Sequence, residues 1–307
     1  VDEMITLDRT LGIPDPVRTA DLLTHRSTLL WMRSRYPEAI ADLNACIQLY
    51  YEAGDYLNAE SRQSNLGLVY WLMGDLVPAE TNTRAALSLY RKIGLDQMLT
   101  YAAGNLGLIC FCRGDLDGGR FYFEEQITVA KKRKYLREEY RGAWNLALLD
   151  FYQGHVDRLK EVYDATLEYY NSRGILDVLY LHANWMALYY EKIGAHEKAL
   201  EIAREGVRVG RENDLPRLEQ ISLRSLANLL PREEREAPLR RSLALAEHCG
   251  RRLEIAAAWL MLSGVMTDAP QRLAAWQTGR DLLVENGAEQ WLEGASMDAP
   301  PFLPAFL

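Results

Sequence analysis

Apolar residues recur along this chain at the three- and four-residue spacing of α-helices. Leu66, Val69, Tyr70 and Met73 form one such run, and a second run follows between 79 and 90. This spacing places side chains on one face of a helix. The pattern predicts pairs of helices, and no stretch shows the alternation that would predict a strand.

The helical pattern returns every 40 residues. NLGLVYWLMGD at 65 to 75 is nearly repeated as NLGLICFCRGD at 105 to 115. Several columns keep this period: Asn65, Asn105 and Asn145; Gly74, Gly114, Gly154 and Gly194; and the small residues Ala39, Ala79, Gly119 and Ala199. A fixed period of this length is typical of stacked repeats in which each unit is one helix hairpin.

Glycines mark both turns of the predicted hairpin. Gly74 ends the first helix of a unit, and Gly54, Gly94 and Gly174 end second helices. A helix often ends on a left-handed residue, a conformation that glycine adopts without steric cost. The remaining length predicts helices of about 17 residues, or roughly 25 Å.

The motif columns resemble the tetratricopeptide repeat. The matching positions are Leu66-Gly67, Tyr70, Gly74, Ala79 and Ala86, then Leu106-Gly107 and Gly114, and more loosely Leu146-Ala147 and Gly154. The resemblance implies an all-α fold, a right-handed superhelical α-solenoid of stacked antiparallel helix hairpins. It also implies that the first helix of each unit lines a concave face.

The period divides the chain into three parts. Residues 1–16 are expected to form an N-terminal capping segment, and residues 17–290 a superhelix of about seven helix pairs. The first unit is degenerate, with Arg26-Ser27 in place of Leu-Gly. Residues 291–307 include three prolines among the last eight positions and are expected to be an extended or disordered C-terminal tail.

The resemblance identifies the columns that would face a ligand. They contain an aromatic row, an asparagine row and flanking polar side chains: His25, Trp31, Asn65, Trp71, Tyr101, Asn105, Phe111, Arg141, Trp144, Asn145, Phe151 and Asn184. Aromatic rings beside amides suit a peptide backbone or a sugar face. Two structural alternatives stay open: the aromatic row packs between repeats, and the asparagine row bridges adjacent units by hydrogen bonds.

Charge and apolar run lengths limit the partners. The net charge of -8 opposes the phosphate neutralisation on which nucleic-acid affinity depends, so no direct nucleic-acid partner is expected. The basic run KKRK at 131–134 falls at a predicted helix C-terminus, where cations complement the helix dipole. No apolar run approaches the roughly 18 to 20 residues of a membrane helix, and we expect a cytoplasmic protein.

Motifs for chemistry are missing from the sequence. The histidines form no HxxxH or HExxH pair, and no phosphate-binding GxxxxGK[ST] loop is present. Four cysteines lack a CxxC pair and are expected to be small buried hydrophobes. We expect a non-catalytic protein without a metal or other cofactor.

The 40-residue repeat and its Asn-Leu-Gly wording resemble the sensor arm of signal-transducing (STAND) NTPases of the maltose-regulator type. That resemblance implies an inducer or a protein partner in the concave groove and a covalently linked NTPase module, and the beginning at Val1 fits an excised sensor domain. The alternatives are a stand-alone scaffold that captures an extended peptide or a helix of another protein, and a peptide-pheromone sensor.

Overall fold

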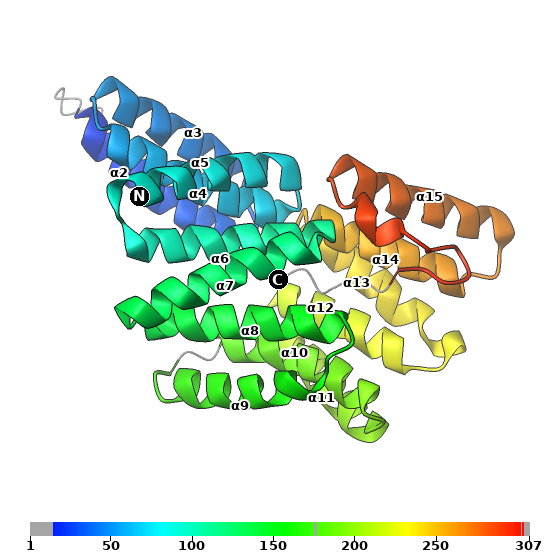
Figure 1. Cartoon of the computed structure of the whole chain (residues 1–307). Helices are drawn as coiled ribbons and strands as arrows, with labels where there is room; N and C mark the ends of the chain where they lie inside the picture. Colours follow the sequence, from blue (N-terminus) through cyan, green and yellow to red (C-terminus); the bar gives the residue numbers. More distant parts are fainter. Residues whose placement is uncertain (1–14, 175–176, 302, 304–307) are drawn as a thin grey trace.

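The chain folds into a stack of helix hairpins (Figure 1). The computed structural model describes residues 15–174, 177–301 and 303, and the side chains of all of these except 177–184. Over this part the chain is helical and contains no strand, which confirms the all-α prediction. The helices are α2 (Pro16–Met32), α3 (Tyr36–Glu52), α4 (Tyr56–Met73), α5 (Leu76–Ile93), α6 (Asp96–Arg113), α7 (Leu116–Arg133), α8 (Leu136–Tyr152), α9 (Asp157–Asn171), α10 (Asp177–Lys192), α11 (His196–Glu212), α12 (Pro216–Leu229), α13 (Glu236–His248), α14 (Arg252–Val265) and α15 (Ala269–Glu285), with short 3-10 helices η1 (Arg232–Glu234) and η2 (Glu289–Leu292).

Each helix from α2 to α14 packs against the next helix in sequence. First helices of successive hairpins also touch, α4 with α6, α6 with α8 and α10 with α12. Even-numbered helices therefore share one side of the stack. This arrangement is an α-solenoid, as the repeat predicts.

The turns keep the period even where glycine is absent. Gly74, Gly94 and Gly114 have φ of 88°, 71° and 88°. Within the described ranges, the only non-glycine residues with positive φ are Ser34, Lys134 and Asp214. Each of them lies a whole number of 40-residue periods from a turn glycine, Ser34 from Gly74, and Lys134 and Asp214 from Gly94. The backbone therefore imposes the left-handed cap, and Lys134 closes α7 as the basic run predicts.

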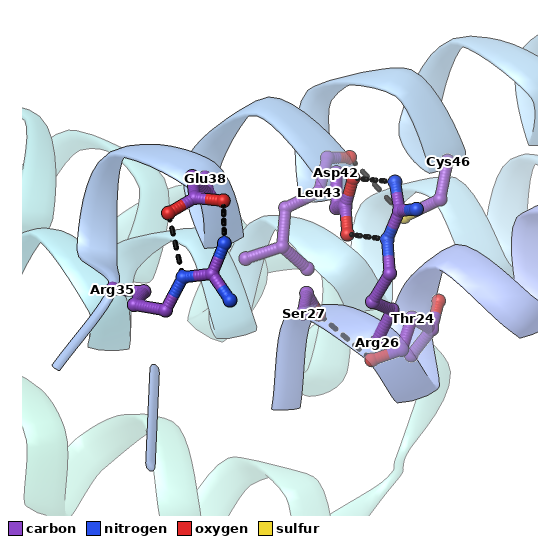
Figure 2. A network of polar contacts seen from close by, with 8 residues as sticks. All are labelled: Thr24, Arg26, Ser27, Arg35, Glu38, Asp42, Leu43 and Cys46. Atoms are coloured by element: carbon purple, nitrogen blue, oxygen red, sulfur yellow. Dashed lines mark hydrogen bonds and ion pairs between the residues drawn. The ribbon is translucent and has the colours of Figure 1, made fainter. Parts of the chain in front are cut away.

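In three successive units a leucine at the same position of the 40-residue repeat packs onto the preceding hairpin. Leu66, Leu106 and Leu146 are buried in this way. Arg26 occupies the same column in the first unit, and instead forms two hydrogen bonds with Asp42 of α3, at 2.7 and 2.6 Å (Figure 2). Its departure from leucine gives the first described hairpin a polar outer side.

Replacing Asp42 by alanine is expected to lower the free energy of unfolding by about 1.5–2 kcal/mol, because a charged hydrogen-bonded partner of Arg26 is lost. Urea denaturation measures the change. Glu38→Ala is the matched control: its ion pair with Arg35, also in Figure 2, has both side chains 53% exposed and is expected to contribute far less. Equal losses in the two variants would contradict a stabilising role of the Arg26–Asp42 pair.

The last hairpin packs back on the early ones, so the superhelix closes on itself. Figure 1 shows α14 and α15, in orange, beside the ends of α4 and α5. Arg252 of α14 forms an ion pair with Asp75 at 3.4 Å, and the Trp291 Nε1–H donates to the carbonyl oxygen of Cys112 at 2.9 Å. Leu253, Leu260 and residues of α5 and α6 share one hydrophobic cluster.

The segment after α15 begins with η2 and continues without helix to residue 301. Ser296 and Ala299 exchange backbone hydrogen bonds at 3.0 and 3.1 Å, which makes a tight turn. Leu303 is buried in the cluster that holds Leu253 and Leu260. Residues 1–14, 302 and 304–307, which belong to the predicted capping segment and tail, lie outside the described residues.

Candidate functional site: an inner groove

The predicted binding residues lie on α2, α4, α6, α8 and α10, the first helices of their hairpins. They differ in burial: His25 is exposed; Trp31, Asn65, Trp71, Tyr101 and Arg141 are half-buried; Asn105, Phe111, Trp144, Asn145 and Phe151 are buried. The side chain of Asn184 lies outside the described residues. Only part of the set therefore offers surface to a ligand.

Three of these residues join one polar network between hairpins. Arg141 donates to the Asn105 side-chain oxygen at 2.5 Å and to Glu138 at 3.3 Å, and its guanidinium lies 5.8 Å from the Tyr101 ring centroid. Glu138 also accepts from Gln126 at 3.0 Å. The network ties α6, α7 and α8 together and neutralises the buried Glu138 carboxylate.

Part of the predicted aromatic row is covered by the C-terminal segment. Trp291 of η2 lies edge-on to Phe111 and Tyr152, with ring centroids 6.2 and 5.8 Å away. Tyr152 also contacts Phe151 and Trp185 edge-on. Burial raises the pKa of Tyr152 above its ordinary range, so the phenol stays protonated. These rings form one interior cluster along with Trp144, which is 1% exposed.

The four cysteines are free and buried, as predicted from their spacing. The Trp71 Nε1–H contacts the Cys112 sulfur at 3.4 Å. Burial raises the pKa of the Cys112 thiol to about 12, so it carries no charge at neutral pH. These cysteines therefore pack as small apolar groups.

Charged side chains lie deep in the interior. Arg224 of α12 and Glu254 of α14 form an ion pair at 3.0 Å with exposures of only 4% and 1%, and Gln220 donates to Glu254 at 2.9 Å. Burial, followed by the nearby Arg251, lowers the pKa of Arg217 to about 10, which still leaves it protonated at neutral pH. The buried ion pair between Arg224 and Glu254 thus links α12 to α14.

Beside the aromatic cluster a cavity of about 510 Å³ opens between α8, α10 and α12. Its walls include Phe151, Tyr152, Leu188, Glu191, Lys192 and Asn228. Phe151 is the one predicted binding residue among them. The other wall residues occupy repeat positions that are expected to face the concave side, but they were not among the predicted binding residues.

Asn228 had a sequence signal of its own. The ninth position of the four preceding units is Leu68, Leu108, Leu148 and Leu188. Asn228 breaks this run of leucines with a polar side chain, and it lies at the cavity wall. The first unit is also polar at this position, with Thr28, which does not line the cavity.

A second cavity of about 260 Å³ adjoins the first, because Asn228 lines both. It extends past Arg232 and Met261 to Arg272 of α15 and Asp298. We call the two cavities together the inner groove. It draws walls from several hairpins and from the segment after η2.

Two other hollows are each built by a single hairpin or helix. One of about 540 Å³ lies on α2 and α3, where Arg26 and Arg35 are already paired with Asp42 and Glu38 (Figure 2). The other, about 750 Å³, lies on the exposed face of α11. Neither uses the side that successive repeats share.

Within the described residues, no group of three or more His, Cys, Asp or Glu side chains could hold a metal ion. The same part of the chain contains no helix that is both long enough and apolar enough to span a lipid bilayer.

Comparison with known proteins finds likeness of fold alone. No protein-family model and no curated protein matches the chain. The Rap conjugation gene regulator of plasmid pLS20, in complex with the Phr* peptide, matches with a TM-score of 0.72 and 13% identity over 89% of this chain and 75% of that one. A Rap protein complexed with Competence and Sporulation Factor matches at 0.69 and 11% over 94% and 80%. Aspartyl phosphate phosphatase F from Bacillus subtilis matches at 0.60 and 11% over 99% and 77%.

These likenesses confirm the helical-repeat class, since Rap proteins are tetratricopeptide-like repeat proteins. They do not include the NTPase sensor arm to which the repeat length had pointed.

Proposed function

We propose that the chain is a peptide-sensing helical-repeat protein whose inner groove binds an extended peptide of another molecule. One observation carries the proposal: α8, α10 and α12, from three successive hairpins, jointly line an open cavity of about 510 Å³. A cavity of this size is within the range of ligand sites in proteins. A ligand there contacts several repeats at once.

The chemistry of the walls suits a peptide. Leu188 offers apolar surface to side chains, with the buried Phe151 ring behind the wall, and the Asn228 amide is able to pair with both the C=O and the N–H of a peptide unit. Glu191 and Lys192 place opposite charges at the rim. Apolar walls with a few polar groups favour binding over catalysis.

The similar solved structures favour the stand-alone peptide sensor over the NTPase arm. Two of them are regulators in complex with a signalling ligand, the Phr* peptide in one and Competence and Sporulation Factor in the other. No observation on the described residues favours a linked NTPase module or a small inducer. We therefore base the proposal on the peptide alternative.

Selection from a displayed library of random peptides, with the full chain as target, tests the proposal. Asn228→Ala is expected to weaken the selected peptides about tenfold, the effect of one lost amide pairing. Asn44→Ala, a change of the same kind on the exposed face of α3, is expected to leave affinity unchanged. Isothermal titration calorimetry measures both. Failure to select any peptide, or equal affinity for the wild type and Asn228→Ala, would contradict the proposal.

A further inference from the structure

The second cavity of the inner groove has an excess of positive charge. Arg232, Arg235 and Arg272 line it together with a single carboxylate, Asp298, which leaves a net charge of +2. The neighbouring acidic residues are Glu233 and Glu234 of η1 and Glu236, which is paired with Arg240. In a chain with a net charge of -8, this is a local site for an anionic group.

Two of the arginines are held in place by backbone carbonyls. Arg272 Nε donates to the oxygen of Ser263 at 2.9 Å, and its Nη2 donates to that of Met297 at 3.0 Å. Arg235 Nε donates to the oxygen of Leu230 at 2.7 Å. Guanidinium groups fixed in this way are prepared to receive a carboxylate without further ordering.

Arg232 differs from its neighbours. Within the part of the chain that the structure describes, its side chain forms no hydrogen bond and no ion pair within 4.0 Å. It nevertheless acts on Asp298 at longer range: Arg272 first, and more weakly Arg232, hold the pKa of that carboxyl below its usual range. Asp298 is therefore ionised at neutral pH.

The segment after η2 already brings one carboxylate to this cavity. The turn from Ser296 to Ala299 presents Asp298 to Arg272, while the Asp298 side chain stays 87% exposed. Pro300 approaches α14 at Gly264, where a Cβ would lie 3.2 Å from the proline ring. The chain thus lays a turn of its own, with one carboxylate, along the end of the groove.

We propose that the arginine cavity is the carboxylate-binding subsite of the inner groove, and that Asp298 is an internal ligand which an acidic group of the incoming peptide replaces. This inference rests on the proposed function. The carboxylate belongs to an acidic side chain or to the C-terminus of the peptide. A tethered competitor acts at an effective concentration on the order of millimolar, so weak or neutral peptides are excluded.

Short peptides copied from the chain serve as probes. The first has the sequence of residues 295–301, with acetyl and amide ends and a fluorescent label; the second carries asparagine in place of the aspartate. A third is the asparagine peptide with a free C-terminal carboxylate, which separates the two sources of the anion. Fluorescence anisotropy measures their affinity for the full chain and for Asp298→Asn.

The acidic probe is expected to bind Asp298→Asn about tenfold more tightly than the neutral probe, as expected for a charge-assisted hydrogen bond. It is also expected to bind Asp298→Asn more tightly than the wild type, since the internal ligand has lost its charge. Tight binding of the third probe would assign the subsite to a C-terminal carboxylate, and tight binding of the first alone to a side chain. Either result supports the subsite.

Arg232→Gln in the Asp298→Asn background is expected to weaken the acidic probe about fivefold or more. Arg240→Gln, the same charge change on the exposed face of α13, is the matched control and is expected to have no effect. Circular dichroism confirms that each variant folds. Equal binding of all three probes, no binding of any probe, or equal losses in the two arginine variants would overturn the subsite. Library-selected peptides that still depend on Asn228 would leave the proposed function standing.

Discussion

Replacing Glu254 by glutamine is expected to lower the free energy of unfolding by about 3–5 kcal/mol, the usual cost of breaking a buried ion pair on one side. The Glu254 carboxylate lies 3.0 Å from Arg224, and neither side chain is more than 4% exposed. Glutamine keeps the shape but removes the negative charge. Arg224 and the nearby Arg251 would then lie in the interior without that carboxylate.

Urea denaturation followed by circular dichroism measures this loss. Glu201→Gln makes the same chemical change in an exposed pair with Lys198 at 2.7 Å, and is expected to lower the free energy of unfolding far less. If both variants lowered the free energy of unfolding by the same amount, the Arg224–Glu254 pair would have to be accessible to water. That result would contradict the closed interior between α12 and α14.

The second large effect is expected at a turn. Gly74→Ala should lower the free energy of unfolding by about 3–4 kcal/mol, the sum of left-handed backbone strain and a steric clash. Gly74 has φ of 88°, and a Cβ there would lie 2.9 Å from the backbone nitrogen of Leu253 in α14. The clash arises only because the end of the array packs back on α4.

Gly94→Ala is the matched control for that variant. Gly94 has φ of 71°, and nothing lies within 4 Å of its Cβ position. Only the strain of about 1–2 kcal/mol is then expected. Chemical denaturation of both variants separates the two contributions, and equal losses would show that α14 does not contact the turn after α4.

The helices and turns could be predicted from the sequence because each hairpin is formed by the same interactions between residues close in the chain. Helical spacing, leucine contacts and left-handed turns recur every 40 residues. The turn columns hold their conformation even at Ser34, Lys134 and Asp214, which are not glycines. A periodic backbone therefore shows in the sequence despite local exceptions.

Closure of the superhelix could not be predicted in the same way. It joins residues as far apart as Cys112 and Trp291, or Asp75 and Arg252. Such contacts depend on a small rotation between units that accumulates over the whole array, and the repeat pattern does not encode its size. The covering of Phe111 by Trp291 follows from this closure.

The same limit applies to the groove. When the same residue recurs in every unit, its environment is the same in every unit. For the asparagine row that environment includes a contact between repeats, because the Asn105 side-chain oxygen accepts a hydrogen bond from Arg141 of the next hairpin. The wall of the inner groove is instead built from side chains that differ between units, such as Leu188 and Asn228 at equivalent positions. The predicted binding columns stay a prediction, and of their residues Phe151 lines the cavity between α8, α10 and α12.

Photo-cross-linking of a library-selected peptide to the full chain, followed by mass spectrometry, tests the central claim most directly. The peptide carries a photoreactive side chain near its middle. Cross-links are expected on the inner groove, at the C-terminal ends of α8, α10 and α12, and to disappear when unlabelled peptide is added in excess. Cross-links that map instead to the outer helices α9 and α11 would contradict peptide binding in the inner groove.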